Sequence, residues 1–487
     1  MAQAQIQDLW TVGGESKSSS HSDHTIFLSS GKRMLQRVAF GLLPSFLQRR
    51  MRPGLCKGQR LRRTSYLDGL RGVASFIVFM GHFTEENIGW YSEPYGAYED
   101  GAASSPLQLP FVRIIYASRP MVHIFFIISG FVLSYKPLQQ IHSQNYLALT
   151  QTLSSSVFRR ALRLFLPSFV TLFVLALAVF YGLADERYAW RKLFLSEQLS
   201  HVWQTCLQLF AESWSMKDLQ SLHPQYNPAL WTIPIEFSQS LLLFLTVLGL
   251  SRCTVNVRLF LVASIAVFCF LNGQLYTVEF LGGMLIAELT LLQNRSFDTP
   301  IASPVAALLA KFEEPPTPSG CSFKQRLVKA FWVANFVGGL FIASWPNVHT
   351  EEVWGIRFLD AHTPRMYSGQ QAWFCLAAFQ IVAACTQLIC LQELFNTDVA
   401  QYLGNISFAL YLTHNLCLGS LEPRFNPLFA RFGKVTFWGR HLTWLAGLVV
   451  YLPVVICVSD FFWRAVDTPA VKLARWLEAK CTVEKQL

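Results

Sequence analysis

The stretch YLDGLRGVASFIVFMGHF, residues 66–83, is apolar along most of its length but contains an arginine and a histidine, Arg71 and His82. On a helix, the eleven steps between them place the two side chains about 16 Å apart along the axis and about 20° apart around it. Ionisable residues inside a membrane helix cost about 2.5 kcal/mol or more near the bilayer centre, so they usually face a polar cavity or a partner. Because both residues share one face, we expect that face to line a reaction path.

The composition is that of a polytopic membrane protein. Of the 487 residues, 52% are hydrophobic and 14% are charged, whereas an average soluble domain has about 25% charged residues. The net charge of +10 comes from lysines and arginines that flank apolar runs, so we interpret it as a topology signal and expect no nucleic-acid partner. The eleven cysteines form no CxxC pair and no zinc-finger spacing, and we expect no bound metal.

Hydropathy predicts an all-α fold, a polytopic transmembrane bundle with about ten helices in the lipid bilayer. Each span needs about 20 apolar residues. The ten candidate spans have their centres near Ser75, Phe126, Leu172, Leu241, Ala266, Met284, Phe336, Ala378, Ala409 and Gly447. A tight turn near Asn272 and Gly273 separates the fifth span from the sixth.

The chain divides into three parts. Residues 1–63 are predicted to be a cytoplasmic arm, disordered at first and then basic, without the apolar core of a cleaved signal peptide. Residues 64–476 are predicted to form the transmembrane domain, with a flexible, proline-rich cytoplasmic loop at about 295–329, and residues 477–487 a tail. Ten helices put both termini on one side, and the lysine and arginine bias predicts that this side is cytoplasmic.

A tryptophan-rich segment, residues 184–228, connects the third and fourth spans on the opposite side. It contains Trp190, Trp203, Trp214 and His223. This composition fits a lid over a substrate site, and it equally fits an aromatic belt at the membrane interface.

His82 is the leading candidate for a general base, because histidine can accept a proton from a hydroxyl group near neutral pH. Glu85 and Glu86 follow it by three and four residues. If the helix continues, either carboxylate could orient the imidazole and stabilise its protonated form. A cluster of charges that meets solvent at a helix end fits the same spacing.

A basic group, Arg159, Arg160 and Arg163, stands just before the apolar run of the third span, at its predicted cytoplasmic mouth. The guanidinium fork matches phosphate oxygens, so such a group can bind phosphates. An anchor that obeys the positive-inside rule has the same pattern. Arg71 has a similar alternative, because it lies one turn after Asp68 and could form an intrahelical pair.

Three further ionisable residues lie in apolar segments. They are Glu236 in LWTIPIEF, His123 in RPMVHIFFIISGF and His414 in LGNISFALYLTHN. Each needs a partner at that depth, either in a cavity or between packed helices. The sequence contains no glycine-rich phosphate loop and no GxSxG motif, which argues against the commonest nucleotide-binding and hydrolase sites.

Six blocks of sequence, in order, resemble the acyltransferase 3 family of membrane-bound O-acyltransferases. They are YLDGLRGVASFIVFMGHF with its Arg-x10-His spacing, FFIISGF, RRALRLFLP, LWTIPIEF, LGNISFALYLTHN and DTPAVKLARW. The resemblance covers Tyr66 to about Trp476. It implies about ten transmembrane helices and the transfer of an acyl group, often acetyl, to a hydroxyl of a sugar or a small lipophilic molecule.

The resemblance also implies roles for the candidate residues. His82 would be the catalytic base, Arg71 a donor-binding or site-organising residue, and Arg160 and Arg163 contacts to the phosphates of acyl-CoA. His123 stands where bacterial members often have an acidic residue before FF. In all, we assign His82, Glu85 and Glu236 to catalysis, and Arg71, Arg160, Arg163, His123 and His414 to donor or acceptor binding.

We therefore expect an O-acyltransferase of an endomembrane such as the endoplasmic reticulum. Its acyl-CoA would be a co-substrate rather than a permanently bound cofactor, and its acceptor a small alcohol. The long N-terminal arm and the lack of an esterase-like domain resemble the fungal members in secondary-metabolite pathways, such as those of terpenoids or polyketides. A transporter or exporter of a lipophilic metabolite is the alternative, because a ten-helix bundle with buried charges also suits translocation.

Overall fold

The computed structural model describes residues 40–41, 43–51, 61–96, 104–186, 189–214, 224–298, 323–350, 353, 355–364, 366–367, 369–429, 431 and 436–482. Within these ranges every regular element is a helix, which confirms the all-α class. Most of the predicted N-terminal arm, most of the loop predicted at about 295–329, and the last five residues of the tail lie outside the described residues.

The chain forms two compact units, residues 1–57 and residues 58–487. In the described part of the first unit there is one short helix, α2 (Ser45–Met51). The amide of Gln48 donates hydrogen bonds to the carbonyl oxygens of Phe40 and Leu43, at 3.0 and 2.7 Å, and thereby ties the helix to the turn before it.

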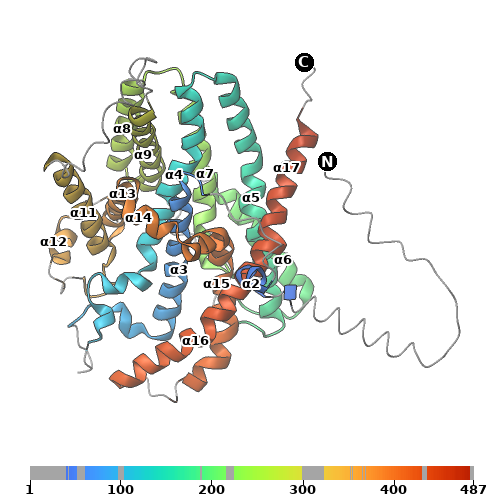
Figure 1. The fold of residues 1–487 in the computed structure, drawn as a ribbon. Coiled ribbons are helices and arrows are strands. Elements are labelled where there is room, and N and C mark those ends of the chain that lie inside the picture. The colour runs from blue at the N-terminus through green and yellow to red at the C-terminus, as the bar shows by residue number, and fades with distance from the viewer. Residues whose placement is uncertain are drawn as a thin grey trace. The chain divides into compact units, whose positions relative to one another are not determined.

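The second unit is a helical bundle (Figure 1). Its α-helices are α3 (Ser65–Asn87), α4 (Ser118–His142), α5 (Tyr146–Phe180), α6 (Leu195–Glu212), α7 (Thr232–Gly249), α8 (Val255–Leu271), α9 (Leu275–Asp298), α11 (Phe323–Ala343), α12 (Ile356–Ala361), α13 (Gln371–Gln387), α14 (Ile389–Phe395), α15 (Asp398–Phe429), α16 (Phe437–Phe462) and α17 (Thr468–Cys481). Short helical turns are η3 (Gly89–Ser92), η4 (Pro106–Gln108), η5 (Val112–Tyr116), η7 (Pro228–Trp231) and the π-turn η10 (Trp463–Asp467).

A helix covers each of the ten predicted centres, and Gly273, with φ of +76°, lies in the predicted turn between α8 and α9. Among the described residues, six helices are long and apolar enough to cross a membrane, and a seventh span results if α13 and α14, bent by 98°, are counted as one. The number ten is therefore approximate. α8 is apolar but has 17 residues, and α3 and α15 are more polar. Polar helices are tolerated here because α3 and α15 pack against each other inside the bundle, with α4 and α16 beside them.

Two helix crossings in the bundle depend on glycine. A Cβ atom on Gly130 of α4 or Gly283 of α9 would lie within 3 Å of the backbone of the other helix. Gly72 of α3 and Gly404 of α15 are in the same situation. Such close backbone contact is typical of membrane bundles, where small residues allow helices to gain van der Waals contact.

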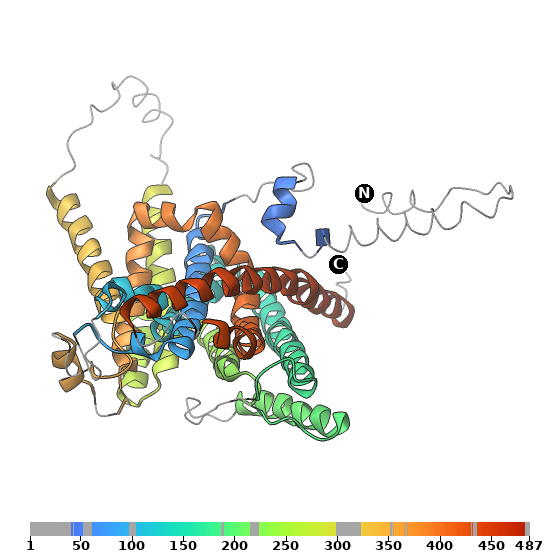
Figure 2. The ribbon, with the colours of Figure 1, turned by 90° about the horizontal axis from the view of Figure 1, so that it is seen from below.

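The tryptophan-rich segment 184–228 contains α6, which packs against α5 and α7. The helix runs lengthwise across Figure 2, the view from below, so it lies across the direction in which α5 and α7 run in Figure 1. Trp190, Trp203 and Trp214 are exposed. Among the described residues of this segment, Pro228 at its end lines the cavity described below, and His223 lies outside the described residues. The exposed tryptophans fit an interfacial belt, and the contact of Pro228 with the cavity leaves the lid open as a prediction.

Tyr226 contacts two polar side chains of α6. Its hydroxyl accepts a hydrogen bond from the Gln198 amide (2.8 Å) and lies 2.6 Å from Nδ1 of His201. Burial, and secondarily the charge of Lys192, lower the pKa of His201 below its ordinary value of 6.5. Burial raises the pKa of Tyr226 to about 12, so its hydroxyl keeps its hydrogen and can donate a hydrogen bond to Nδ1 of a neutral His201.

We expect α6 to loosen on acidification. Because the pKa of His201 is lower in the folded than in the unfolded chain, its contribution to stability is complete above about pH 6.5 and is lost as the pH falls below that value. Amide hydrogen exchange in α6, corrected for intrinsic rates, should therefore increase between about pH 7 and pH 5. His201→Gln should remove this dependence, and an unchanged dependence in that variant would exclude His201 as its source.

Candidate functional site

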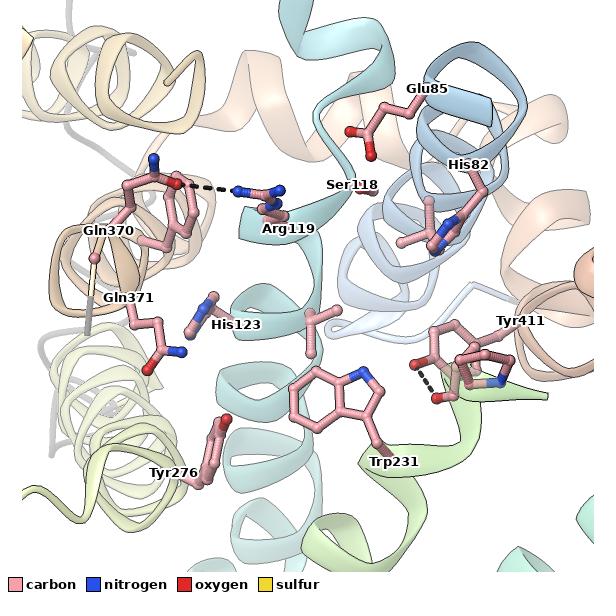
Figure 3. Close-up of a pocket in the computed structure, with 16 residues that line it drawn as sticks. His82, Glu85, Ser118, Arg119, His123, Trp231, Tyr276, Gln370, Gln371 and Tyr411 are labelled. Atoms are coloured by element: carbon pink, nitrogen blue, oxygen red, sulfur yellow. Dashed lines mark hydrogen bonds between the residues drawn. The ribbon is translucent and has the colours of Figure 1, made fainter. Parts of the chain in front are cut away.

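A cavity of about 600 Å³ lies where α3 ends and α4, α9 and α13 begin (Figure 3). Its lining residues are Val78, His82, Glu85, Ser118, Arg119, Val122, His123, Pro228, Ala229, Trp231, Tyr276, Gly369, Gln370, Gln371, Phe374 and Tyr411. Most of the wall is apolar, and a few polar side chains converge on the interior. This is the usual composition of a small-molecule site.

α3 brings His82 to the cavity through a regular row of apolar residues. Leu67, Leu70, Ala74 and Val78 follow one another at spacings of three and four, and all are buried. Such a row fixes the rotation of a helix about its axis. His82 is the next position in the row, so the packing that buries the row also directs His82 to the cavity wall.

The ring of His82 stacks on the ring of His414 from α15, with centroids 5.2 Å apart and planes 28° apart. His414 is fully buried and does not line the cavity. Its Nδ1 lies 3.2 Å from the carbonyl oxygen of Leu410, and its Nε2 has no hydrogen-bond partner among the described residues. The structure thus brings together two histidines that the sequence singled out separately, with His414 behind His82.

Glu85 lines the same cavity as His82, as the three-residue spacing on a continuing helix predicts. Its carboxylate accepts a hydrogen bond of 2.5 Å from the side-chain amide of Asn347. The backbone amide of Asn347 in turn donates to the carbonyl oxygen of Ser92. Glu85 is therefore held in place from outside α3, with its charge on the cavity side in Figure 3.

His123 lies on the cavity wall opposite α3, on the first turns of α4 (Figure 3). Its Nδ1 is 2.5 Å from a carboxylate oxygen of Glu279 on α9, and Glu279 is fully buried. The sequence interpretation did not identify Glu279. A lone carboxylate in the apolar segment LYTVEFLGGMLIAEL was the available signal, because an ionisable residue there needs a partner.

The predicted phosphate-binding arginines form a cluster outside this cavity. Arg163 lies within electrostatic range of Arg71, Arg159 and Arg160, and of the carboxylate of Asp467. α5 begins at Tyr146, where Asn145 caps it, so the arginines lie inside the helix and not at its start. Arg163 is exposed, and no described residue forms an ion pair or hydrogen bond with its guanidinium.

The other arginines of the cluster have partners. Arg160 forms an ion pair of 2.5 Å with Glu236 of α7, and its Nε donates to the hydroxyl of Ser240. Arg71 donates to the hydroxyl of Ser407 and to the carbonyl oxygen of Gly404, at 3.0 and 3.2 Å, and lies 3.3 Å from Asp68.

Arg71, Arg160 and Glu236 therefore tie helices together at the cluster, and none of them lines the cavity. The catalytic role assigned to Glu236 and the donor-binding roles assigned to the arginines remain predictions.

The cavity can support proton transfer at a bound molecule. Two imidazoles and a carboxylate meet in a largely apolar space, where a histidine can remove a proton from a substrate hydroxyl and return it to a leaving group. Within the described ranges, no three histidine, cysteine, aspartate or glutamate side chains are grouped so that they could hold a metal ion.

Comparison with known proteins identifies relatives over most of the chain. The family model described as an acyltransferase domain, Acyl_transf_3, matches residues 64–464. The O-acetyltransferase PaAT-1 of Phomopsis amygdali is 30% identical over an alignment of 456 positions, which covers 88% of this chain and 87% of that protein. The acyltransferase clz18 of Cochliobolus lunatus is 25% identical over 87% of this chain and 97% of its own length. No solved structure matches the chain.

Proposed function

This chain belongs to the Acyl_transf_3 family of acyltransferases, and on that premise we propose that it transfers an acyl group from acyl-CoA to a hydroxyl of a small lipophilic molecule. The observation that carries the proposal is a largely apolar cavity, of a size that suits a small ligand, with His82 and Glu85 on its wall. The Phomopsis amygdali relative is named an O-acetyltransferase, which supports acetyl as the acyl group. The acceptor would be an alcohol of secondary metabolism, such as a terpenoid or a polyketide.

In this proposal His82 is the general base. It accepts the proton of the acceptor hydroxyl while the hydroxyl oxygen attacks the thioester carbonyl carbon. The C–S bond then breaks, the electron pair leaves with sulfur, and the proton on His82 passes to the thiolate to give free CoA. Glu85 favours the protonated imidazole between these steps, because a nearby carboxylate stabilises a positive charge.

The donor would be held by the arginine cluster. Acyl-CoA has its phosphates and its thioester at opposite ends of a long flexible arm. Arg163 is the cluster member best suited to a phosphate, since it is exposed and has no ion-pair partner among the described residues. Arg160 is already paired with Glu236 and would contribute mainly through its charge.

The same proposal orients the protein in the membrane. The positive-inside rule puts the arginine cluster and both termini on the cytoplasmic side, which is also the side that supplies acyl-CoA. His82 then lies toward the lumenal side of the endoplasmic reticulum or another endomembrane.

The test is acyl transfer by the purified full-length protein. With acetyl-CoA and a panel of terpenoid and polyketide alcohols, we expect release of free CoA and a product heavier by one acetyl group. Acetyl-pantetheine lacks the phosphates of acetyl-CoA. Its KM should be at least about tenfold higher than that of acetyl-CoA, because charge-assisted phosphate contacts are lost. Arg163→Gln should reduce this difference, whereas Lys472→Gln, on an exposed position of α17, should leave it unchanged.

One result would overturn the proposed acyl transfer, and another would overturn the proposed phosphate site. Binding of the alcohols without any CoA release would favour the transporter alternative. A normal rate together with equal KM values for the two donors would remove the phosphate site while leaving the acyltransferase assignment intact.

A further inference from the structure

The pair His123–Glu279 has no part in the reaction as described so far. His123 lines the same cavity as His82 but on the opposite wall (Figure 3), and its bond to the buried Glu279 joins α4 to α9. Nδ1 of His123 is 2.5 Å from one carboxylate oxygen of Glu279, and the other carboxylate oxygen is buried without a hydrogen-bond partner in the described structure.

The opposite ring nitrogen of His123, Nε2, is left for a ligand. No described residue forms a hydrogen bond with this nitrogen, and the nitrogen is not completely buried. His123 is itself only 6% exposed, so the accessible part of the ring faces the cavity that it lines. Two contacts fix the plane of the His123 ring. Glu279 binds its Nδ1 edge, and the ring of Phe374 lies beside it, with the two ring centroids 5.9 Å apart.

The burial of Glu279 determines whether Nε2 of His123 has a hydrogen. A net negative charge on the pair would cost several kcal/mol at this depth, because a buried charge without compensation is strongly destabilising. Three protonation states leave the pair neutral. In one, an imidazolium faces a carboxylate, and in the second, a protonated Glu279 donates to Nδ1 of a neutral imidazole. The third puts the carboxyl hydrogen on the other oxygen of Glu279, where it is buried and meets no hydrogen-bond acceptor among the described residues, so this state is disfavoured. Nε2 has a hydrogen in the two favoured states.

We propose that His123 is a catalytic residue that donates a hydrogen bond from Nε2 to the carbonyl oxygen of the thioester, with Glu279 as its positioning residue. The proposal rests on the acyl transfer proposed above. As the acceptor oxygen attacks, the carbonyl π electrons move onto this oxygen, and the Nε2–H group stabilises the oxyanion. When the C–S bond breaks, the carbonyl reforms, and the Nε2 hydrogen stays on His123 throughout. The proton from the acceptor is still managed by His82.

This role differs from that of a second general base in a way that one variant can separate. In Glu279→Gln, the new amide can donate to Nδ1 of His123, which keeps the hydrogen on Nε2. That tautomer suits a hydrogen-bond donor but disables a base, and the equivalent change in a catalytic triad costs about 10⁴-fold. We therefore expect Glu279→Gln to keep kcat within about tenfold of wild type, because the donor is retained.

Removal of the Nε2–H donor of His123 should lower kcat far more. In His123→Leu, kcat with acetyl-CoA and the panel alcohol that wild type acetylates fastest should fall about 10²–10³-fold, the usual effect of losing one oxyanion donor. The KM for acetyl-CoA should change by less than about threefold, since the bond strengthens only in the transition state. Both variants must first give wild-type gel-filtration profiles.

A matched pair of double variants covers the case in which His123→Leu does not fold. His123→Gln with Glu279→Gln places an amide donor in the cavity, and His123→Met with Glu279→Gln places a side chain of similar length without a donor. The first should have a kcat at least about tenfold above the second.

Equal rates in this pair would overturn the proposal, and so would a loss in Glu279→Gln as large as that in His123→Leu. If wild type itself transfers no acetyl group, the proposed function fails. If wild type is active and the His123 variants match it, only the oxyanion role fails.

Discussion

We expect His82→Ala to lower acyl transfer by at least about 10³-fold while the protein remains folded. A positioned general base contributes about 10²–10⁴-fold to a rate, and a methyl group cannot accept the proton of the acceptor hydroxyl. The ring of His82 contacts His414 and the cavity, so its removal enlarges a space that already exists and should cost little stability. The measurement is the rate of CoA release and of acetylated product by the purified variant, with its thermal unfolding compared to wild type.

His362→Ala is the matched control for this experiment. His362 is exposed, follows α12, lies 2.7 Å through Nδ1 from the carbonyl oxygen of Phe358, and does not line the cavity. Its loss removes a histidine of the same type without affecting the site, so the rate should stay at the wild-type level. A His82→Ala protein that keeps more than about a tenth of the wild-type rate would exclude His82 as the base.

The helical period alone was sufficient to predict that Arg71 and His82 share one face of α3, although only His82 lines the cavity. Arg71 and His82 were expected on one face, and both contact α15, Arg71 through Ser407 and Gly404, and His82 through His414. This works because 3.6 residues per turn fix the angle between any two positions on a helix, whatever surrounds it. The positions of the ten helices were predictable for a similar reason, since apolar length is a local property of the sequence.

The pairing of ionisable residues across neighbouring helices was not predictable in the same way. Glu236 and Arg160 were singled out separately, one as a carboxylate in need of a partner and one as a possible phosphate contact, and the structure pairs them with each other. The partner of His123 is Glu279, far away in sequence and on a helix that the sequence did not place beside α4. Which helices become neighbours depends on the fit of their surfaces, and no periodicity within one helix specifies it.

The crossing of α3 and α15 places His82 against His414, and it depends on two glycines. A Cβ atom on Gly404 would lie 2.5 Å from the carbonyl oxygen of Asp68 and 2.9 Å from its carbonyl carbon. A Cβ atom on Gly72 would meet the backbone of Leu403 and Gly404 within 3 Å. Backbone atoms cannot rotate out of the way as a side chain can, so the two helices would have to separate.

We therefore expect Gly404→Ala to destabilise the protein by about 1–3 kcal/mol, the usual cost of overpacking, and Gly404→Leu to prevent folding. Separation of α3 from α15 would also displace His82 from its ring partner, so Gly404→Ala should lose at least about tenfold in acyl transfer even where it is folded.

Gly419→Ala is the control, because it lies on the same helix and a Cβ atom there meets nothing within 4 Å. That substitution should be neutral or stabilising by about 0.5–1 kcal/mol, as alanine is the better helix former. Thermal unfolding and acyl-transfer rates of the two alanine variants are measured side by side. Equal stabilities and equal rates would mean that the close crossing at Gly404 is not what holds His82 in place.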